Sequence, residues 1–346
     1  TGPSAGHSAL AAPLSDFVVM VDRDSSLFTA GPPLVRASMG EQVSKDALGG
    51  PAVHAVVSGV AHNVATDVTA ALSLARRYLS YFPSNAWSRP PTDDALQGDS
   101  EVSERRLEEI LDLIPPNPRR PYDMRTVLDC LVDSGSLFEL QPAHGESVLT
   151  ALARLGGQAV AIVANQPMVR AGSIDSSAAH KAARFIEVTS AFHLPLVQLA
   201  DNPGVLAGSA SEQAGILRAA ARMFAAQHRA QVPKLHVTVR KAFGFGSSVM
   251  GQNAFGGQTV SLAFPGAMLG GIPAAVGGAT AKADTATQQA LVDNEAAGPW
   301  RLAGTVTYDE VIDPRELRNA LLAGLRLSRA RQSAAVAPEQ HTGYLP

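Results

Sequence analysis

The second half of the chain alternates short apolar runs with longer helical patterns, and this rhythm limits the available folds more than any other feature. The apolar runs predict buried strands at 158–164, 195–200, 235–239 and 259–264. The intervening and following patterns predict helices at 176–192, 211–230 and 314–331, the first capped by Asp175 or Ser176 and the last begun by Asp313-Pro314. Alternating strands and helices favour right-handed crossovers and a largely parallel sheet, hence an α/β fold.

The first part of the chain has weaker signals. Short strands are predicted at 17–21 and 26–30, and an apolar stripe predicts a helix at 67–80. Residues 82–120 are rich in proline and contain a charged segment, 101–113, for which we expect a helix. We therefore predict three parts. Residues 1–81 form the C-terminal part of an N-terminal domain, 82–120 form an inter-domain connection, and 121–346 form a C-terminal domain.

Composition excludes several classes of function. Apolar residues make up 46% of the 346 residues and charged residues 17%, with a net charge of −3 and no basic block, so nucleic acid is not an expected partner. No apolar run is long enough to span a membrane. The single cysteine, Cys130, favours a reducing, cytoplasmic setting. The first residues do not resemble a signal peptide, and the chain reads as one entered partway, with the first domain truncated.

Three glycine turns are the candidate functional segments. The richest is Arg240–Gly251, which follows an apolar strand and contains Gly244 and Gly246; a short helix is expected near Ser247. Peptide N–H groups at such a turn favour a developing negative charge. The other two are Asp201-Asn202-Pro203-Gly204, just past another strand, and Gly2–Ser8. When each turn is taken alone, a loop that binds nothing is the favoured explanation.

Side-chain catalysts are not evident in the sequence. The nine histidines are scattered and none has the spacing of a zinc ligand, so no metal site is expected. No convincing nucleophile elbow, dinucleotide fingerprint or phosphate loop is present. The chemistry is therefore expected to come from backbone groups.

Several segments, taken together and in order, resemble the carboxyltransferase (β) subunits of biotin-dependent acyl-CoA carboxylases, of the propionyl- and acetyl-CoA carboxylase type. The likeness covers nearly the whole chain. The matching segments are Gly2–Gly6 with Leu14–Val21, Thr29-Ala30-Gly31-Pro32, Gly40-Glu41, Leu48-Gly49-Gly50, Gly59–His62, Pro121-Tyr122-Asp123 with Arg125, Lys181–Phe185, Asp201–Gly204 with Gly208 and Glu212, Val232–Gly244, and Asp309–Pro314.

The resemblance implies two domains of the ClpP/crotonase type, each a ββα superhelix that contributes one oxyanion hole. Acyl-CoA and biotin would meet between subunits of a homo- or hetero-hexamer. The N-domain hole falls on Gly6 and His7 and the C-domain hole on Phe245 and Gly246, which are the expected catalytic positions. The expected substrate-binding positions are Asp201, Pro203, Gly204, Gly244, Ser247 and Ser248.

Three positions depart from the family pattern. The family usually has glycine where His7 and Phe245 stand, and a side chain there would strain a backbone with positive φ. Ser248 replaces a common aspartate near the acyl pocket, which leaves the length of the acyl chain open.

The implied reaction transfers a carboxyl group from carboxybiotin to the α-carbon of an acyl-CoA. The chain has no biotinylation motif and no ATP-binding glycine loop, so a biotin carboxylase and a biotin carrier are the implied partners. Alternatives are the reverse reaction, in a biotin-dependent decarboxylase, and a weakly active scaffold subunit of a mixed complex. An enoyl-CoA hydratase would need paired glutamates in glycine turns, and Glu187 and Glu212 do not occupy such turns.

Overall fold

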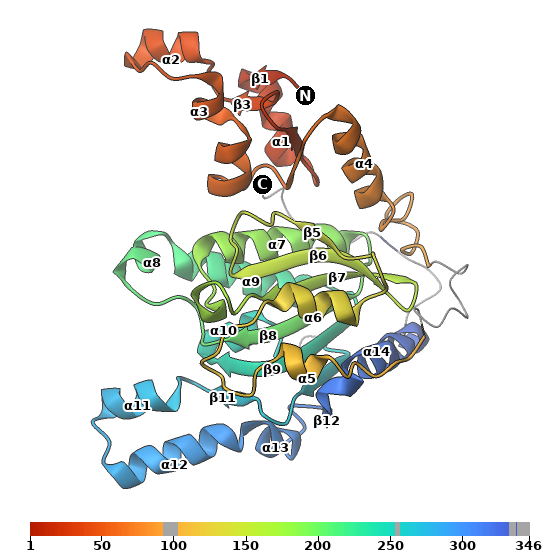
Figure 1. Cartoon of the computed structure of the whole chain (residues 1–346), viewed down its shortest axis with the longest axis vertical. Coiled ribbons are helices and arrows are strands. Elements are labelled where there is room, and N and C mark those ends of the chain that lie inside the picture. The colour runs from red at the N-terminus through yellow and green to blue at the C-terminus, as the bar shows by residue number, and fades with distance from the viewer. Residues whose placement is uncertain (93–102, 253–256, 332–336, 338–346) are drawn as a thin grey trace.

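The computed structural model describes residues 1–92, 103–252, 257–331 and 337. An eight-stranded sheet forms the centre of the molecule, in the order β12-β10-β9-β8-β7-β6-β5 with β11 also beside β9 (Figure 1). Its strands are β5 (Phe138–Leu140), β6 (Val148–Leu155), β7 (Gln158–Asn165), β8 (Leu196–Asn202), β9 (Lys234–Phe243), β10 (Val260–Ala263), β11 (Met268–Gly270) and β12 (Glu310–Val311).

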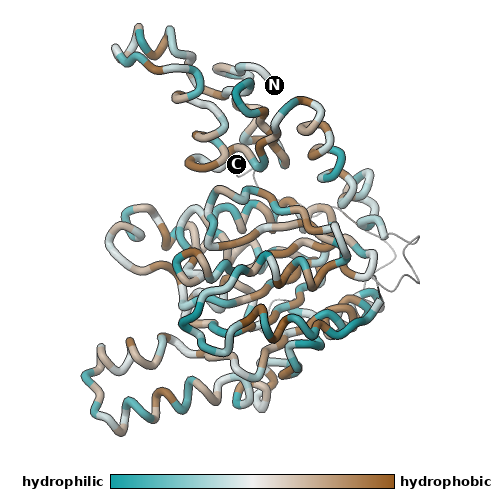
Figure 2. The backbone as a smooth tube through the Cα atoms, viewed as in Figure 1, coloured by the Kyte–Doolittle hydropathy of each residue, from teal (hydrophilic) through white to brown (hydrophobic). Residues whose placement is uncertain are grey.

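Helices cover both faces of this sheet. On one face lie α5 (Ile110–Leu113), α6 (Met124–Leu131) and α14 (Leu317–Arg331), with the 3-10 turn η5 (Pro314–Glu316) before α14. On the other lie α7 (Ser176–Ala191) and α9 (Ile216–Arg229). Because both faces are covered, strands β6 to β9 are buried along almost their whole length, and Figure 2 shows hydrophobic positions gathered in the central sheet. This burial confirms the reading of continuous apolar runs as strands.

The sheet is less parallel than the rhythm predicts. Strands β7 to β12 pair in parallel, but β5–β6 and β6–β7 are antiparallel. The apolar runs do not predict β6, and so they predict no hairpin before β7. The turn at Gly156-Gly157, with φ of 63° and 74°, closes that hairpin directly.

Two predicted helices differ from those observed. The predicted helix 211–230 is two helices, α8 (Ser209–Gln213) and α9, because Gly215 adopts a φ of 78° between them. The predicted helix 101–113 is wrong over its described first part, since only α5 at its end is an α-helix. Arg105 there lies outside any helix or strand, and its backbone amide donates to Asn319 Oδ1 at 2.9 Å. Residues 101 and 102 lie outside the described residues.

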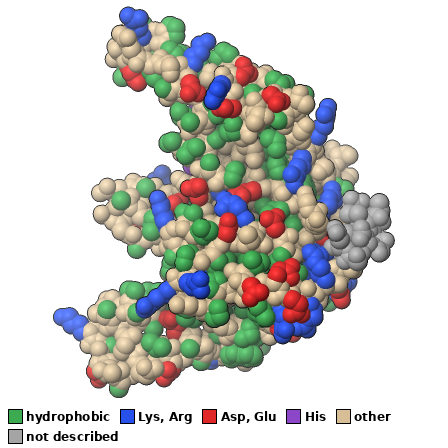
Figure 3. All heavy atoms as spheres, in the orientation of Figure 1, with side chains coloured by type: hydrophobic (Ala, Val, Ile, Leu, Met, Phe, Trp, Pro, Cys, Tyr) green, Lys and Arg blue, Asp and Glu red, His purple; other side chains and the backbone are tan. Residues whose placement is uncertain are grey.

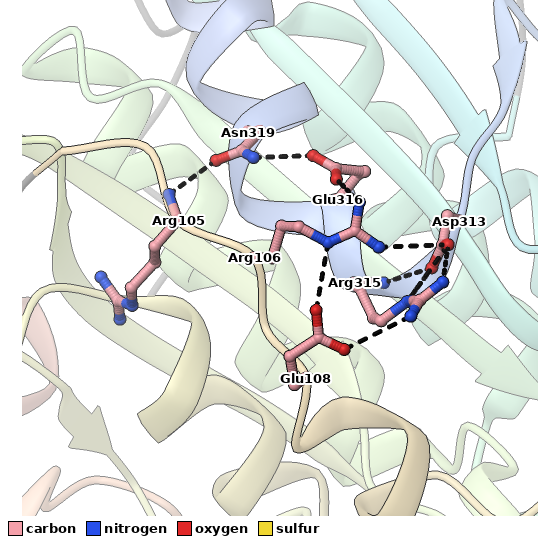
Figure 4. Close-up of polar contacts among 7 residues, drawn as sticks. All are labelled: Arg105, Arg106, Glu108, Asp313, Arg315, Glu316 and Asn319. Carbon is pink, nitrogen blue, oxygen red and sulfur yellow. Dashed lines mark hydrogen bonds and ion pairs between the residues drawn. The ribbon is translucent and has the colours of Figure 1, made fainter.

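Charged side chains join this segment to the start of α14. Figure 4 shows Arg106 and Arg315 between Glu108, Asp313 and Glu316, with Arg106 3.1 Å from Glu108 and 2.7 Å from Glu316. Nearby, Leu107 and Ile110 are fully buried in the same core cluster as α6 and α14. Part of the predicted connection 82–120 thus packs as core of the second half of the chain.

The first part of the chain lies above the edge of the sheet formed by β5 (Figure 1). It holds two small parallel ribbons, β1–β3 and β2–β4. Its elements are β1 (Pro3–Ala5), η1 (Gly6–Leu10), α1 (Ala11–Leu14), β2 (Val19–Val21), β3 (Ser26–Phe28), α2 (Pro32–Met39), α3 (Lys45–Gly49), η2 (Ala52–Val57), β4 (Asn63–Ala65) and α4 (Val68–Leu79). The last of these matches the helix predicted at 67–80, with Asp67 as its cap.

Aromatic rings and a polar loop join the two parts. Tyr78 of α4 stacks on Phe17 with ring centroids 4.3 Å apart. Tyr78 also belongs to the buried core cluster that contains the apolar residues of α7. In the loop after β5, the Gln141 amide donates to the carbonyl of His62 at 2.8 Å. Buried Lys181 donates to the carbonyls of Gln141 and His144 and so braces the same loop from below.

Two further helices, α11 (Ala274–Ala281) and α12 (Thr285–Ala296), form an arm that projects from the sheet together with α13 (Gly298–Ala303). Figure 3 shows this arm, α8 and the α2–α3 region as three projections with hollows between them. Across the described residues, every helix is too short or too polar to traverse a lipid bilayer.

Candidate functional site

The two glycine turns of the second half meet at the carboxyl ends of β8 and β9. Helix α10 (Gly244–Val249) begins directly after β9, and Gly246 packs against the Asp201–Gly204 turn. A Cβ atom at Gly246 would lie 2.2 Å from Asn202 Oδ1 and 2.7 Å from Gly204 Cα. The approach of the two turns therefore requires glycine at this position. The carboxyl edge of parallel strands is also where open α/β sheets bind ligands.

Helix α10 presents backbone donors at this edge. The first amides of a helix have no acceptor within it, and for α10 these include Phe245 and Gly246. Within the described residues, no hydrogen bond from either amide is found. The Ser247 hydroxyl donates to the Gly244 carbonyl at 2.7 Å and stabilises the turn. Two amides at the start of a helix form a suitable site for a developing oxyanion.

The substitution at Phe245 does not strain this turn. The only positive φ here is 54° at Gly244, while Phe245 is a helical residue with a half-exposed ring. The first-half turn has the same design, since Gly6 has a φ of 64° and His7 does not have a positive φ. Both departures from glycine fall on residues whose backbone any L-amino acid adopts.

Asp201 lies inside the fold and holds the turn from beneath. Its carboxylate accepts from Arg240 Nε at 2.8 Å and from the Tyr122 hydroxyl at 2.9 Å, and it lies 3.6 Å from Lys241 Nζ. Burial lowers the pKa of Lys241, and burial followed by the nearby Asp201 charge raises the pKa of Tyr122. The Arg240 guanidinium also stacks over the Tyr122 ring at 4.5 Å.

An asparagine that sequence reasoning missed orders the same turn. Asn165, at the end of β7, accepts through Oδ1 from the Asp201 amide at 3.0 Å and from Asn202 Nδ2 at 2.9 Å. Asn202 Oδ1 in turn accepts from the Gly204 amide at 3.0 Å. The polar pair Asn165-Gln166 at the end of an apolar strand is the signal that could have identified it. Pro203 lines a pocket beside this turn.

Buried side chains that carry no sequence signal hold the other end of α10. Gln227 Nε2 donates to the Ser248 carbonyl at 3.0 Å, and His236 Nδ1 bonds to the Met250 carbonyl at 2.8 Å. Because a carbonyl only accepts, Nδ1 carries the hydrogen, and Nε2 accepts from the Thr238 hydroxyl at 2.8 Å. Burial lowers the pKa of His236 to about 4, which keeps the ring neutral and this tautomer fixed.

The first-half turn stands apart from this assembly. Gly6 and His7 follow β1, which among the described strands pairs with β3 alone, and His7 is exposed. The Gly2 amide donates to Asp24 Oδ2 at 2.9 Å, an exposed hydrogen bond. Among the described residues no hydrogen bond or ion pair joins this turn to α10, and Figure 1 shows it in the upper part of the molecule. The predicted sites are thus brought together within the second half and not between the halves.

Known proteins share both the sequence and this architecture. The carboxyl transferase domain family matches residues 1–342. The chain is 34% identical to the carboxyltransferase subunit of propionyl-CoA carboxylase from Haloferax mediterranei, over 100% of this chain and 68% of that protein. It is 36% identical to methylmalonyl-CoA decarboxylase subunit alpha from Veillonella parvula, over 100% and 67%.

Solved structures agree with this likeness. The 12S transcarboxylase hexamer core, with hydrolysed methylmalonyl-coenzyme A bound, superposes with a TM-score of 0.90 at 32% identity, covering 99% of this chain and 66% of that one. The beta subunit of Pseudomonas aeruginosa geranyl-CoA carboxylase gives 0.62 at 25% identity, covering 98% and 64%. The chain spans about two thirds of the length of these relatives. The predicted crotonase-type α/β class is confirmed, and the chain belongs to the carboxyl transferase domain family.

Proposed function

We propose that the chain provides a carboxyltransferase site, which moves a carboxyl group between the biotin of a partner protein and the α-carbon of an acyl-CoA. The observation that carries this proposal is the free amide pair of Phe245 and Gly246, held at the carboxyl edge of the sheet in a chain of this family. The chain would consist of two halves, residues 1–81 and 121–346, joined through residues 82–120. A biotin carboxylase and a biotin carrier are the partners that the reaction requires.

Backbone donors suit this reaction because negative charge develops on oxygen in both reactants. The amides of Phe245 and Gly246 would hold the ureido oxygen of biotin. The biotin, when bound in its carboxylated form, supplies the carboxyl group. The Gly6–His7 turn would hold the thioester oxygen as the enolate forms. Each donor is worth roughly 3–4 kcal/mol of barrier. Since the two turns lie apart in one chain, a second subunit would bring them together, as in a hexamer.

Within the second-half turn the named positions take different roles. Gly204 and Gly244 shape the turn. The Ser247 hydroxyl holds the Gly244 carbonyl, and the buried Asp201, paired with Arg240, acts as a positioning group. Pro203 would contact the substrate directly, since it lines the pocket beside α10. Ser248 would leave room for an acyl group, and its carbonyl ties α10 to Gln227.

Decarboxylation is the second candidate, since the similar Veillonella protein is a methylmalonyl-CoA decarboxylase subunit. The same site would then run the transfer in reverse. A direct test combines the protein with a biotin carboxylase–carrier partner, ATP and labelled bicarbonate, and offers acyl-CoAs of increasing chain length. Labelled acid-stable product supports carboxylation. Labelled carboxyacyl-CoA that loses its carboxyl group only in the presence of biotin supports the reverse direction. The absence of both reactions supports a scaffold.

A further inference from the structure

A pocket of about 670 Å³ opens beside the start of α10, under the arm formed by α11 and α12. Its walls come from the loop 118–121, the loop after β7, the Asp201–Gly204 turn, the end of β9 and the arm. Figure 3 shows basic side chains at the edge of the hollow beside this arm. We call this space the basic pocket.

Positive charge exceeds negative charge around the basic pocket. Arg119, Arg120, Arg240 and Lys241 line it, and Glu295 is the one carboxylate that does so among the described residues. Glu295 already accepts from the Ala274 amide at the start of α11. The buried Asp201 carboxylate is shared between Arg240 and Lys241, so it neutralises only one of these two cations.

The local environment leaves part of this charge without a protein partner. Arg240 Nη2 is buried and makes no hydrogen bond to any described residue. Among the described residues, Lys241 has the 3.6 Å contact with Asp201 alone to offset its burial. Arg119 and Arg120 carry exposed side chains at the entrance, as part of the Pro118–Pro121 wall. An anion that entered the pocket would therefore meet cations in a poorly hydrated setting, where charge interactions are strong.

The remaining lining is apolar and adjoins the amides of α10. Pro203, Phe243, Met268, Met168 and Val292 supply it, and Phe243 precedes Gly244 directly in the chain. A fully hydrated phosphate gains little from such a lining. A carboxylate attached to a short apolar group matches both the cations and the apolar wall.

We infer that the basic pocket binds the carboxylate of a 2-carboxyacyl thioester, through Lys241 with Arg119 and Arg120. This inference rests on the proposed function, because in that reaction the carboxylate of the 2-carboxyacyl thioester lies next to the biotin that the amides of Phe245 and Gly246 would hold. Arg240 lies deeper and is a positioning residue, since it fixes Asp201 and the 118–121 loop. Its Nη1 donates to the carbonyls of Pro115, Asn117 and Arg120 at 2.9–3.2 Å.

Isothermal titration of the complete chain tests the inference without any catalytic step. Three probes are compared: methylmalonyl-CoA, propionyl-CoA and free CoA, which share their phosphates and differ in the acyl group. The variants are Lys241→Met and the double variant Arg119→Gln/Arg120→Gln, with Arg36→Gln on the distant, exposed α2 as the matched control. The double variant changes only exposed side chains and keeps the test valid if Lys241→Met fails to fold.

Wild-type protein is expected to bind methylmalonyl-CoA more tightly than propionyl-CoA. Each pocket variant is expected to reduce that preference about tenfold, the effect of losing a charge-assisted hydrogen bond, and Arg36→Gln is expected to leave it unchanged. Equal affinities for the two thioesters in wild type overturn the inference and leave the proposed function standing. A matching loss in the affinity for free CoA also overturns it, because the pocket would then bind phosphate. Failure of both thioesters to bind overturns both proposals.

Discussion

The turns at Gly6 and at Gly244 have the same local design and very different surroundings. In each, a strand ends, a glycine takes a φ near +60°, and a short helical segment begins. The first follows a three-residue strand in a two-stranded ribbon, and the second follows β9 inside an eight-stranded sheet. Local sequence therefore sets the shape of each turn, while its rigidity comes from residues far away in the chain.

This contrast predicts that the carboxylates beneath the two turns differ in their contribution to stability. Asp201→Ala leaves Arg240 and Lys241 buried without their shared partner, and we expect a loss of roughly 3–5 kcal/mol in the free energy of unfolding. Asp24→Ala removes one exposed hydrogen bond to Gly2 and should leave urea unfolding almost unchanged. Similar urea midpoints for the two variants would show that Asp201 and Asp24 contribute equally to stability, against this prediction.

The glycines themselves provide a smaller test. Gly246→Ala forces a methyl group against Asn202 and the Gly204 backbone, with an expected cost of roughly 1–3 kcal/mol and a loss of the turn geometry. Gly6→Ala meets nothing closer than the Thr29 carbonyl at 3.9 Å, so only its positive φ costs energy, about 1 kcal/mol. Urea unfolding measures both costs. A larger loss for Gly6→Ala would reverse the comparison.

The junction between the two regions predicts a pH effect. Burial lowers the pKa of Lys181 to about 7, against about 10.4 in an unfolded chain. Between these values the unfolded chain binds the proton more strongly. The free energy of unfolding therefore rises with pH from about 7 upward, by at most about 1.4 kcal/mol per pH unit, and is flat below that range.

Urea midpoints of wild type and Lys181→Met at pH 6, 7, 8 and 9 check this effect. The variant loses two hydrogen bonds at every pH, so only the slope is compared. We expect the wild-type slope above pH 7 to exceed that of the variant. Parallel curves would show that Lys181 is charged in the folded protein throughout.

The sequence predicted the second half better than the first for the same reason that the turns differ. Short continuous apolar runs favour strands covered on both faces, and they predict β7, β8 and β10 to within two residues of their observed bounds. The prediction for β9 ends four residues too early, because the strand continues through the charged pair Arg240-Lys241. The turns at 201–204 and 244–246 were recognised from glycine and proline. The sequence wrongly predicts a helix around Arg105, because the backbone amide of Arg105 bonds instead to Asn319, which is distant in sequence.

Asn165 could have been identified from its place at the end of an apolar strand, but the other supports of the site are non-local and could not be predicted. His236 and Gln227 reach the carbonyls of α10 across the core, and neither stands out in its own neighbourhood. Asp201 looks like a binding residue in the sequence, and only burial reveals that its carboxylate faces Arg240. The predicted strain at His7 and Phe245 did not arise, since the positive φ falls on the preceding glycine in each turn.

The most direct test of the account compares Phe245→Pro with Phe245→Ala in the carboxyl-transfer assay. Phe245 is the second residue of α10, where proline is tolerated because its amide has no partner in the helix. Both variants lose the aromatic ring, and only proline removes the N–H donor. We predict a fall in kcat of roughly 10²–10³ for Phe245→Pro relative to Phe245→Ala. Equal rates for the two folded variants would show that this amide does not stabilise the transition state.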